Sequence, residues 1–263
     1  MKRLQSRGTL AVGTSSKLID LAAVKVACQN CSLARLCLPL GLDGNDLDRL
    51  DRIIKRRRPV RRGEHLFQAG DPFHCLYAVR SGSIKTYTPT EDGREQIVGF
   101  YLSGELLGLD AIESQHHVCA GKALETTSVC EVPYDRLAEL SNSLPSLHRQ
   151  IWRLMSREIS HEQGMLLILG KRSADERLAA FLISLSERFL QRGFSGREFN
   201  LSMSRHDIAN YLGLAVETVS RMFSRFQEQG LLRVERRHVA LEDIERLRTL
   251  VGLDAGPEPA RYS

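Results

Sequence analysis

The chain has 263 residues, of which 42% are hydrophobic and 26% are charged, the composition of a globular protein with room for two domains. Its apolar runs are all far shorter than the ~20 residues of a membrane helix, and the apolar patch at 9–13 is too short for a secretory signal. Transmembrane proteins are therefore excluded, and we expect a cytoplasmic protein.

The formal net charge of +5 is concentrated in one short run. Residues 52–62 hold seven Lys and Arg residues and no acid, whereas the remainder of the chain has 30 basic and 32 acidic residues. The favoured interpretation of this run is a solvated turn around Pro59, and the alternative is contact with DNA or a partner. The net charge alone therefore does not indicate a nucleic-acid-binding protein.

Near the N-terminus, three of the six cysteines crowd into ten residues: Cys28, Cys31 and Cys37. In a reducing compartment such a triplet suggests zinc or an iron–sulfur cluster, with a fourth ligand from Cys75, Cys119 or Cys130. Zinc ribbons bring two C-x-x-C pairs and this chain has one, which modestly favours iron–sulfur; unrelated free thiols are the other alternative. Leucines and isoleucines at three- and four-residue spacing then predict a short amphipathic helix over 41–54.

From about 59 to 133 the pattern changes to short alternating pieces separated by glycines. Ser81-Gly82 and Glu91-Asp92-Gly93 are typical turns between such pieces. Many short strands at regular spacing indicate an antiparallel sandwich or barrel. We expect a β-roll here.

A long helix is predicted from Pro145 to about Leu169. Apolar positions advance along it by three and four residues, as in the seam of a two-helix coiled coil. The seam comprises Trp152, Met155, Ile159, Glu162, Leu166 and Leu169. This pattern predicts a homodimer, and the alternative is that the same face packs on the protein's own β-roll. Ser173 and Glu176 form a predicted capping box that opens the next helix, 177–192.

Residues 205–225 have the spacing of a helix-turn-helix: small Ala209, Gly213 at the turn and aliphatic Val219. The first helix is predicted to begin near Ser204 and the second to cover 215–229. One face of the second helix carries Glu217, Ser220 and Arg221, residue types that read base edges in the major groove. The alternative is a solvated face with a Glu217–Arg221 ion pair, but a predicted hairpin wing over 231–241 favours DNA reading.

Several stretches of the sequence closely resemble the oxygen-sensing FNR/ANR branch of the CRP/FNR transcription regulators. The stretches are CQNCSLARLC at 28–37, RSGSIKTYT at 80–88, EQIVGF at 95–100, ALETTSVCEVP at 123–133, ERLAAF at 176–181, RGFSGREF at 192–199 and NYLGLAVETVSR at 210–221. The resemblance covers about residues 25–250. It implies an α+β fold with a cyclic-nucleotide-binding-like antiparallel β-roll, a long dimerisation helix and a C-terminal winged helix-turn-helix domain.

We therefore divide the chain into an arm with the cysteines and a short helix (1–54), the β-roll sensor domain (55–143), the dimerisation helix (144–171), the winged helix-turn-helix domain (172–252) and a flexible tail (253–263). The resemblance implies a regulator, not an enzyme, whose oxygen-labile [4Fe-4S] cluster promotes dimerisation. The dimer would bind TTGAT-N4-ATCAA-like palindromes and activate or repress anaerobic-metabolism genes.

The resemblance also assigns roles to residues that match the family's motifs. The implied cluster ligands are Cys28, Cys31, Cys37 and Cys130, and the implied base-reading residues are Glu217, Ser220 and Arg221. Ser32 and Leu36 match positions that tune how oxygen reaches the cluster, and Ser81 and Gly93 match surfaces that touch RNA polymerase. Cys75 and Cys119 have no counterpart, although Cys119 is close enough in sequence to Cys130 to leave a substitute ligand open.

Glu162 suggests how the switch is balanced. In a parallel homodimer it would face its own copy, and two desolvated carboxylates side by side repel each other. We expect this repulsion to weaken the dimer so that cluster binding decides between monomer and dimer. The family commonly has Asp at this position, and the longer Glu makes the repulsion milder; a carboxylate turned to the rim of the coil is the alternative.

Two positions depart from the family pattern. The wing turn, Glu235-Arg236-Arg237-His238, has no glycine, which puts its geometry in doubt while its charge suits phosphate contact. The second helix of the helix-turn-helix begins at Ala215, where Ser or Thr is a frequent cap, and losing such a cap costs ~1 kcal/mol.

The sequence offers three rival functions. A cyclic-nucleotide-responsive regulator needs an Arg-Ser pair for the phosphate, but His117 and Val118 stand at the matching positions. An iron–sulfur enzyme is disfavoured because the chain has no P-loop, G-x-S-x-G or H-E-x-x-H motif. The third rival is a zinc-stabilised DNA-binding protein without a sensing role, which colour distinguishes because an iron–sulfur protein is brown under anaerobic conditions and a zinc protein is colourless.

Overall fold

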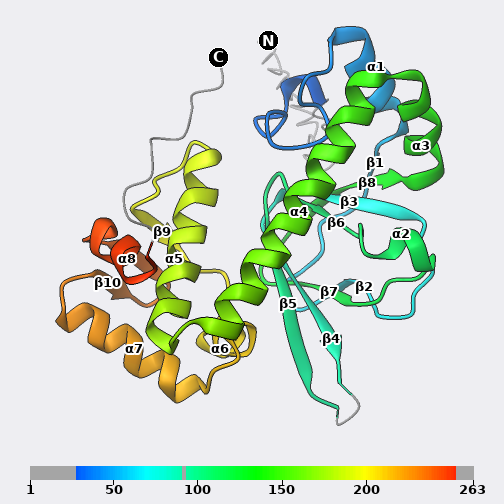
Figure 1. Cartoon of the computed structure of the whole chain (residues 1–263). Coiled ribbons are helices and arrows are strands. Elements are labelled where there is room, and N and C mark those ends of the chain that lie inside the picture. Colours follow the sequence, from blue (N-terminus) through cyan, green and yellow to red (C-terminus); the bar gives the residue numbers. More distant parts are fainter. Residues whose placement is uncertain (1–27, 91–92, 253–263) are drawn as a thin grey trace, which may run out of the picture.

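The computed structural model describes residues 28–90 and 93–252 (Figure 1). The predictions for 1–27, for the turn at 91–92 and for the tail at 253–263 lie outside the described residues. A single 3-10 turn, Cys28–Asn30, precedes helix α1, Gly44–Ile53. The α1 helix begins later than the expected residue 41 because the Asp43 side chain accepts the Asp46 N–H at 2.9 Å and caps the helix there.

The β-roll predicted from the glycine-punctuated pattern is confirmed. Within the described residues it consists of two four-stranded sheets, ordered β1-β8-β3-β6 and β2-β7-β4-β5, with antiparallel pairs throughout. The strands are β1 Lys55–Arg56, β2 His65–Phe67, β3 Cys75–Ser81, β4 Ser83–Pro89, β5 Glu95–Leu102, β6 Leu106–Leu107, β7 Ala120–Ala123 and β8 Ser128–Pro133. The β3–β4 turn requires glycine, because Gly82 has φ +85° and a Cβ there would lie 2.5 Å from Thr127 Oγ1.

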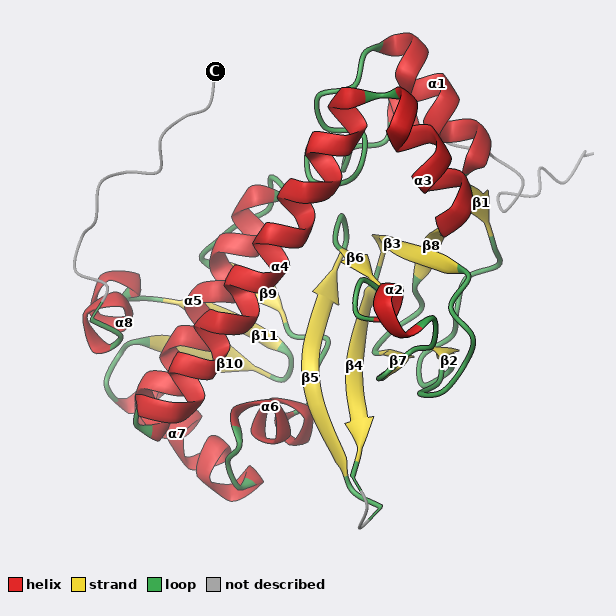
Figure 2. Ribbon diagram, turned by 45° about the vertical axis from the view of Figure 1, so that its right-hand side comes forward, coloured by secondary structure: helices red, strands yellow, loops and turns green. Residues whose placement is uncertain are grey.

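Three helices follow or interrupt the roll: α2 Ala111–Ser114, α3 Tyr134–Ser143 and α4 Pro145–Lys171. Helix α4 has Pro145 in its first turn, as predicted, and its 27 residues span about 40 Å. Figure 2 shows that it runs from α1 and α3 at one end to α5 and α7 at the other. Helix α4 therefore connects the cysteine-bearing end of the molecule with the C-terminal domain.

The C-terminal part has the predicted winged helix-turn-helix fold. Its elements are α5 Ala174–Gln191, β9 Glu198–Asn200, α6 Arg205–Leu212, α7 Val216–Glu228, β10 Leu232–Glu235, β11 His238–Leu241 and α8 Ile244–Leu250, with a sheet ordered β10-β11-β9. Both hydrogen bonds of the predicted Ser173–Glu176 capping box are present, at 3.4 and 2.7 Å. The Arg177 guanidinium bonds the Leu169 and Leu212 carbonyls, which ties the end of α4 to the end of α6.

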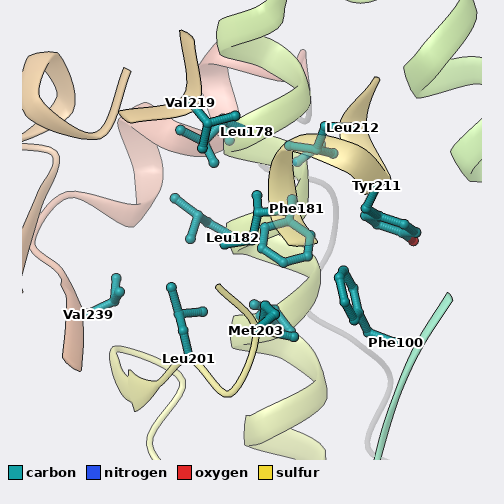
Figure 3. Close-up of a cluster of buried hydrophobic side chains, with 14 of the residues drawn as sticks. Phe100, Leu178, Phe181, Leu182, Leu201, Met203, Tyr211, Leu212, Val219 and Val239 are labelled. Atoms are coloured by element: carbon teal, nitrogen blue, oxygen red, sulfur yellow. The ribbon is translucent and has the colours of Figure 1, made fainter. Parts of the chain in front are cut away.

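The C-terminal domain is docked against the β-roll by a shared apolar core. Phe100 of β5 lies 4.9 Å from the Tyr211 ring and 6.0 Å from the Phe181 ring, measured between centroids (Figure 3). The same core continues through Leu178 and Leu182 of α5 into the helix-turn-helix. Burial of this surface stabilises one relative placement of the two domains.

Charged residues reinforce this docking. Glu105, between β5 and β6, accepts hydrogen bonds from Arg188 and Arg192 of α5, each with a contact of 2.5 Å. Burial acts to raise the pKa of Glu105, but the two guanidinium groups outweigh it and hold that pKa below its ordinary value. A second pair, Lys85 of β4 and Asp207 of α6, closes at 2.8 Å. We call Glu105, Arg188 and Arg192 the interdomain clamp.

Candidate metal centre and nucleic-acid interface

The structure brings four cysteines together around one small pocket: Cys28, Cys31, Cys37 and Cys130. The first belongs to the 3-10 turn, the next two to the loop that follows it, and Cys130 to β8. Strand β8 is central in its sheet, where Cys130 pairs with Arg56 of β1 and Ala78 of β3. The rigid sheet therefore supplies one thiol and the N-terminal loop the other three.

The other two cysteines do not line this pocket. Cys75 begins β3 opposite Pro133. Cys119 is buried and donates its thiol hydrogen to Asp110 at 3.3 Å, next to α2. The geometry thus separates Cys130 from the two alternatives that the sequence spacing left open.

Helix α1 and the loop's own turns hold the cysteine triplet in place. The Cys31 N–H donates to the Cys28 carbonyl at 3.2 Å, and the Cys37 N–H to the Leu33 carbonyl at 3.2 Å. Asp51 of α1 accepts the Cys28 N–H at 3.0 Å and an Arg56 hydrogen bond at 2.5 Å. Asp51 was not singled out from the sequence, because its spacing on α1 looks like that of an ordinary exposed residue.

The pocket is otherwise apolar, with Leu33, Leu38, Ile54, Val79 and Val132 among its lining residues. Burial, followed by the Asp51 contact, raises the pKa of Cys28 to about 12, and burial raises the pKa of Cys37 to about 12.

Burial also raises the pKa of Cys130, although Arg56 and Arg80 offset part of that rise. The raised pKa values of Cys28, Cys37 and Cys130 favour the protonated thiol at neutral pH. A soft metal centre would replace those protons and keep the sulfurs as thiolates.

Four cysteine sulfurs are a donor set that both zinc and iron–sulfur clusters use. Among the described residues, no three His, Cys, Asp or Glu side chains converge closely enough to hold one metal ion. A tetrahedral zinc site requires all its sulfurs within ~2.3 Å of the same ion. In a [4Fe-4S] cluster each of four cysteines binds a different iron, so the sulfurs stand farther apart. The four thiols around one apolar pocket supply the donors that such a cluster needs.

The two residues expected around the ligands lie in different settings. Ser32 is exposed, whereas Leu36 is half-buried against the β5–β6 turn. A Cβ at Gly104, where φ is +90°, would lie 3.0 Å from the Leu36 Cβ. Gly104 borders both the cysteine pocket and a larger cavity, and Leu36 borders the larger one. Leu36 is therefore the point at which the cysteine loop borders that cavity.

The larger cavity has a volume of about 660 Å³ and lies among β4, β5, α4 and α5. Glu105 is among its lining residues, and the Glu105 carboxylate is bonded within the interdomain clamp. His117 is buried, with its ring 3.9 Å from the Phe67 ring in a stacked arrangement, and burial lowers its pKa. Val118 is exposed and apolar. Neither position 117 nor 118 offers a guanidinium for a cyclic phosphate.

The proposed reading surface is formed by two helices and a tight turn. Ser204 caps α6, accepting the Asp207 N–H at 3.1 Å, and Gly213 takes φ +64° before α7. On α7, Val219 is buried against the domain core. The residues expected to read bases are all exposed on the same helix: Glu217, Ser220 and Arg221.

Within the described chain, Glu217 and Arg221 form no ion pair with each other. Ala215 is the N-cap of α7 and makes no capping hydrogen bond, as its side chain predicts. The three residues expected to read bases are therefore exposed on a preformed helix.

The wing lacks glycine and its backbone shows the consequence. Arg236, in the β10–β11 turn, takes φ +58°, a conformation that disfavours non-glycine residues. The Arg237 carbonyl accepts the Leu201 N–H at 2.8 Å and so anchors the wing to the domain. Both arginine side chains lie at the exposed tip of the wing.

The predicted seam forms an outward stripe along α4. Trp152 is 61% exposed, Ile159 52% and Leu166 70%, and Glu162 is also exposed. The other two seam residues, Met155 and Leu169, are half-buried. Met155, Ile159 and Glu162 also border the larger cavity, so the stripe follows the edge between that cavity and the open surface.

Ser81 and Gly93 are not brought together. Ser81 ends β3 just before β4 begins, and Gly93 follows the other end of β4; both are exposed.

Two domain families match the chain. The cyclic nucleotide-binding domain family matches residues 57–143, and the Crp-like helix-turn-helix domain family matches residues 176–250. Among solved structures, FixK2 from Bradyrhizobium japonicum is 31% identical with a TM-score of 0.69, covering 78% of this chain and 100% of that one. A CooA mutant from Carboxydothermus hydrogenoformans, 18% identical with a TM-score of 0.63, covers 80% of this chain and 91% of that one and shows the fold alone. No helix within residues 28–90 and 93–252 has the length and apolarity to cross a membrane.

Two curated relatives match nearly the whole chain. The transcriptional activator protein anr of Pseudomonas aeruginosa is 55% identical over 225 residues, 86% of this chain and 92% of the relative. The fumarate and nitrate reduction regulatory protein of Escherichia coli K12 is 52% identical over 234 residues, 89% of this chain and 94% of the relative. The chain therefore belongs to the FNR/ANR branch of the CRP/FNR family and is a transcription regulator, not an enzyme.

Proposed function

We propose that this regulator senses oxygen through a [4Fe-4S] cluster held by Cys28, Cys31, Cys37 and Cys130. The observation that carries the proposal is the meeting of these four thiols, from a loop and a distant strand, around one apolar pocket. When bound, such a cluster would supply a redox-active centre, and oxygen would oxidise and break down that centre. The chain's own residues hold it and limit solvent access, with Leu36 and Gly104 closing one side.

The output side of the proposal is a homodimer that binds DNA in the cytoplasm. The exposed apolar stripe on α4 supplies a surface for a second copy of this chain. Two copies of α7 would then present Glu217, Ser220 and Arg221 to the half-sites of a TTGAT-N4-ATCAA-like palindrome. Ser81 and Gly93, at opposite ends of β4, are separate contact points for RNA polymerase in this proposal.

The rival sensing functions have less support. A cyclic nucleotide would find no guanidinium at 117 or 118, and Glu105 is already bonded to Arg188 and Arg192. A single zinc ion bound by the same four thiols is the other rival, and its metal content and lack of colour distinguish it from a cluster.

The test is an iron, sulfide and zinc assay on anaerobically purified protein, repeated after exposure to air. We expect about four irons and four sulfides per chain and a brown colour that bleaches in air. One zinc per chain and a colourless protein would contradict the oxygen-sensing function while leaving the DNA-binding assignment intact.

A further inference from the structure

The first half of helix α4 has one buried face and one exposed face. Its inner face buries Leu147 and Leu154, which pack in one core with Leu38 of the cysteine loop. Its outer face begins the exposed seam at Trp152. Gln150 belongs to the inner face, three residues after Leu147 and four before Leu154, and is the polar residue buried within this stripe.

The Gln150 side chain reaches the cysteine loop directly. Its exposed fraction is 2%, and its Nε2 donates to the Cys37 carbonyl at 3.0 Å, across 113 residues of sequence. Among the described residues, this is the hydrogen bond that joins a side chain of α4 to the loop at 31–40. The loop's third thiol is therefore attached, through its own residue's backbone, to the inner face of α4.

The remaining polar atoms suggest that this contact contributes little to the stability of the fold. In the described chain the Gln150 Oε1 is buried without a hydrogen-bond partner. The Cys37 carbonyl also accepts the Leu40 N–H at 3.2 Å, so it stays bonded if the glutamine is lost. Because a buried unpaired acceptor is unfavourable, an apolar side chain of equal length is expected to fold at least as well. Stability alone therefore does not account for a glutamine here.

We propose that Gln150 couples the cysteine loop to the dimer seam. The inference rests on the proposed function, because it takes the loop as cluster-binding and α4 as the dimerisation helix. A helix moves as a rigid rod, so holding its inner face against an ordered loop also fixes the rotation of Trp152, Met155 and Ile159 on its outer face. Gln150 is a positioning residue: it binds neither the cluster nor the partner.

The experiment compares Gln150→Met with a matched control, Gln191→Met, at the exposed end of α5. For anaerobic protein, iron and sulfide content and the dimer dissociation constant are measured, the latter by sedimentation. For air-exposed protein, the rate of trypsin cleavage after Arg35 reports how often the loop opens, because Arg35 is an exposed loop residue.

We expect Gln150→Met to keep the iron and sulfide content of the wild type but to dimerise about five- to tenfold more weakly, the effect of one net hydrogen bond. Its loop should also be cleaved faster than that of the wild type and of Gln191→Met. A loaded Gln150→Met that dimerises like the wild type would overturn the proposal. Loss of iron from this variant would overturn it as well, because Gln150 would then support ligand binding and not coupling.

A wild-type protein without iron would instead refute the proposed function. The trypsin measurement still tests the inference in that case, because it uses metal-free protein. Equal cleavage rates for the wild type and Gln150→Met would show that Gln150 does not tie the loop to α4.

Discussion

The cysteine pocket and the exposed face of α7 differ in how they are assembled and in how much water they meet. The pocket is assembled from segments about 100 residues apart, it is apolar, and its buried thiols resist ionisation. The reading face of α7 comes from one continuous stretch, lies in solvent and already has its polar groups in position. In the proposed function, the comparison teaches that the cysteine pocket needs a bound group to complete it, whereas the exposed face of α7 is already formed and depends only on where the dimer places it.

The largest effect is expected from removing the strand's contribution to the pocket. Cys130→Ser should reduce the iron content of anaerobic protein to background, because serine is a poor ligand for iron–sulfur clusters and three loop thiols remain without the sheet. Cys75→Ser is the control and should retain the wild-type iron content, since Cys75 does not line the pocket. Equal iron in both variants would contradict the assignment of Cys130.

The interdomain clamp joins the β-roll, which carries Cys130, to the domain that carries α7. Its loss is expected to have the second-largest effect. Glu105→Ala leaves Arg188 and the 3% exposed Arg192 without their carboxylate, and breaking such a pair costs about 3 kcal/mol of unfolding free energy. The exposed pair Arg136–Glu139 is the control, and Glu139→Ala should change stability by less than about 1 kcal/mol. Urea titration measures both, and similar losses would contradict the clamp.

The same clamp predicts a pH dependence. Because the pKa of folded Glu105 lies below its ordinary value of 4.5, its contribution is complete above the unfolded pKa and is lost as the pH falls through the folded pKa. The stability difference between wild type and Glu105→Ala, measured by urea titration at several pH values, should therefore shrink on acidification below that range. A difference that stays constant would mean that the carboxylate's charge is not involved.

The reading helix should be sensitive to sequence-specific contacts. Arg221→Ala should weaken binding to a TTGAT-N4-ATCAA-like operator by about 1–3 kcal/mol per half-site and relax discrimination at one base pair. Arg237→Ala on the wing is the comparison: it should weaken operator and random DNA alike and reduce the salt slope by about 1. Fluorescence anisotropy at two salt concentrations distinguishes them, and a uniform loss for Arg221→Ala would remove its role in base reading.

The smallest expected effect concerns the equilibrium between monomer and dimer. Glu162→Ala removes two carboxylates that would face each other in the dimer, and the exposed Glu162 is free to avoid part of that repulsion. We therefore expect a few-fold larger dimer fraction in air, equivalent to about 1 kcal/mol. Sedimentation of the air-exposed variant checks this, and an unchanged monomer fraction would refute it.

Local patterns were enough to predict the helix-turn-helix. The caps at Ser173 and Ser204, the turn at Gly213 and the buried Val219 all act within a few residues of their partners, and each is found as predicted. The start of α4 at Pro145 is another such local signal.

Contacts between residues far apart in the sequence could not be predicted from local patterns. Spacing alone left Cys75, Cys119 and Cys130 as equal candidates, because only strand pairing brings Cys130 next to the loop. Glu105 and Arg188 are 83 residues apart, and charged residues in such contexts normally face solvent. Gln150 falls on a face of α4 whose burial depends on the loop that covers it. These contacts follow from tertiary packing, which no local periodicity encodes.

The most direct test of the account is sedimentation of one anaerobic preparation of the wild-type protein before and after air, with iron content followed in the same samples. The account predicts an iron-loaded dimer that becomes an iron-poor monomer on exposure to oxygen. A dimer that persists after the iron is lost would contradict the claim that the cysteine pocket controls the reading surface.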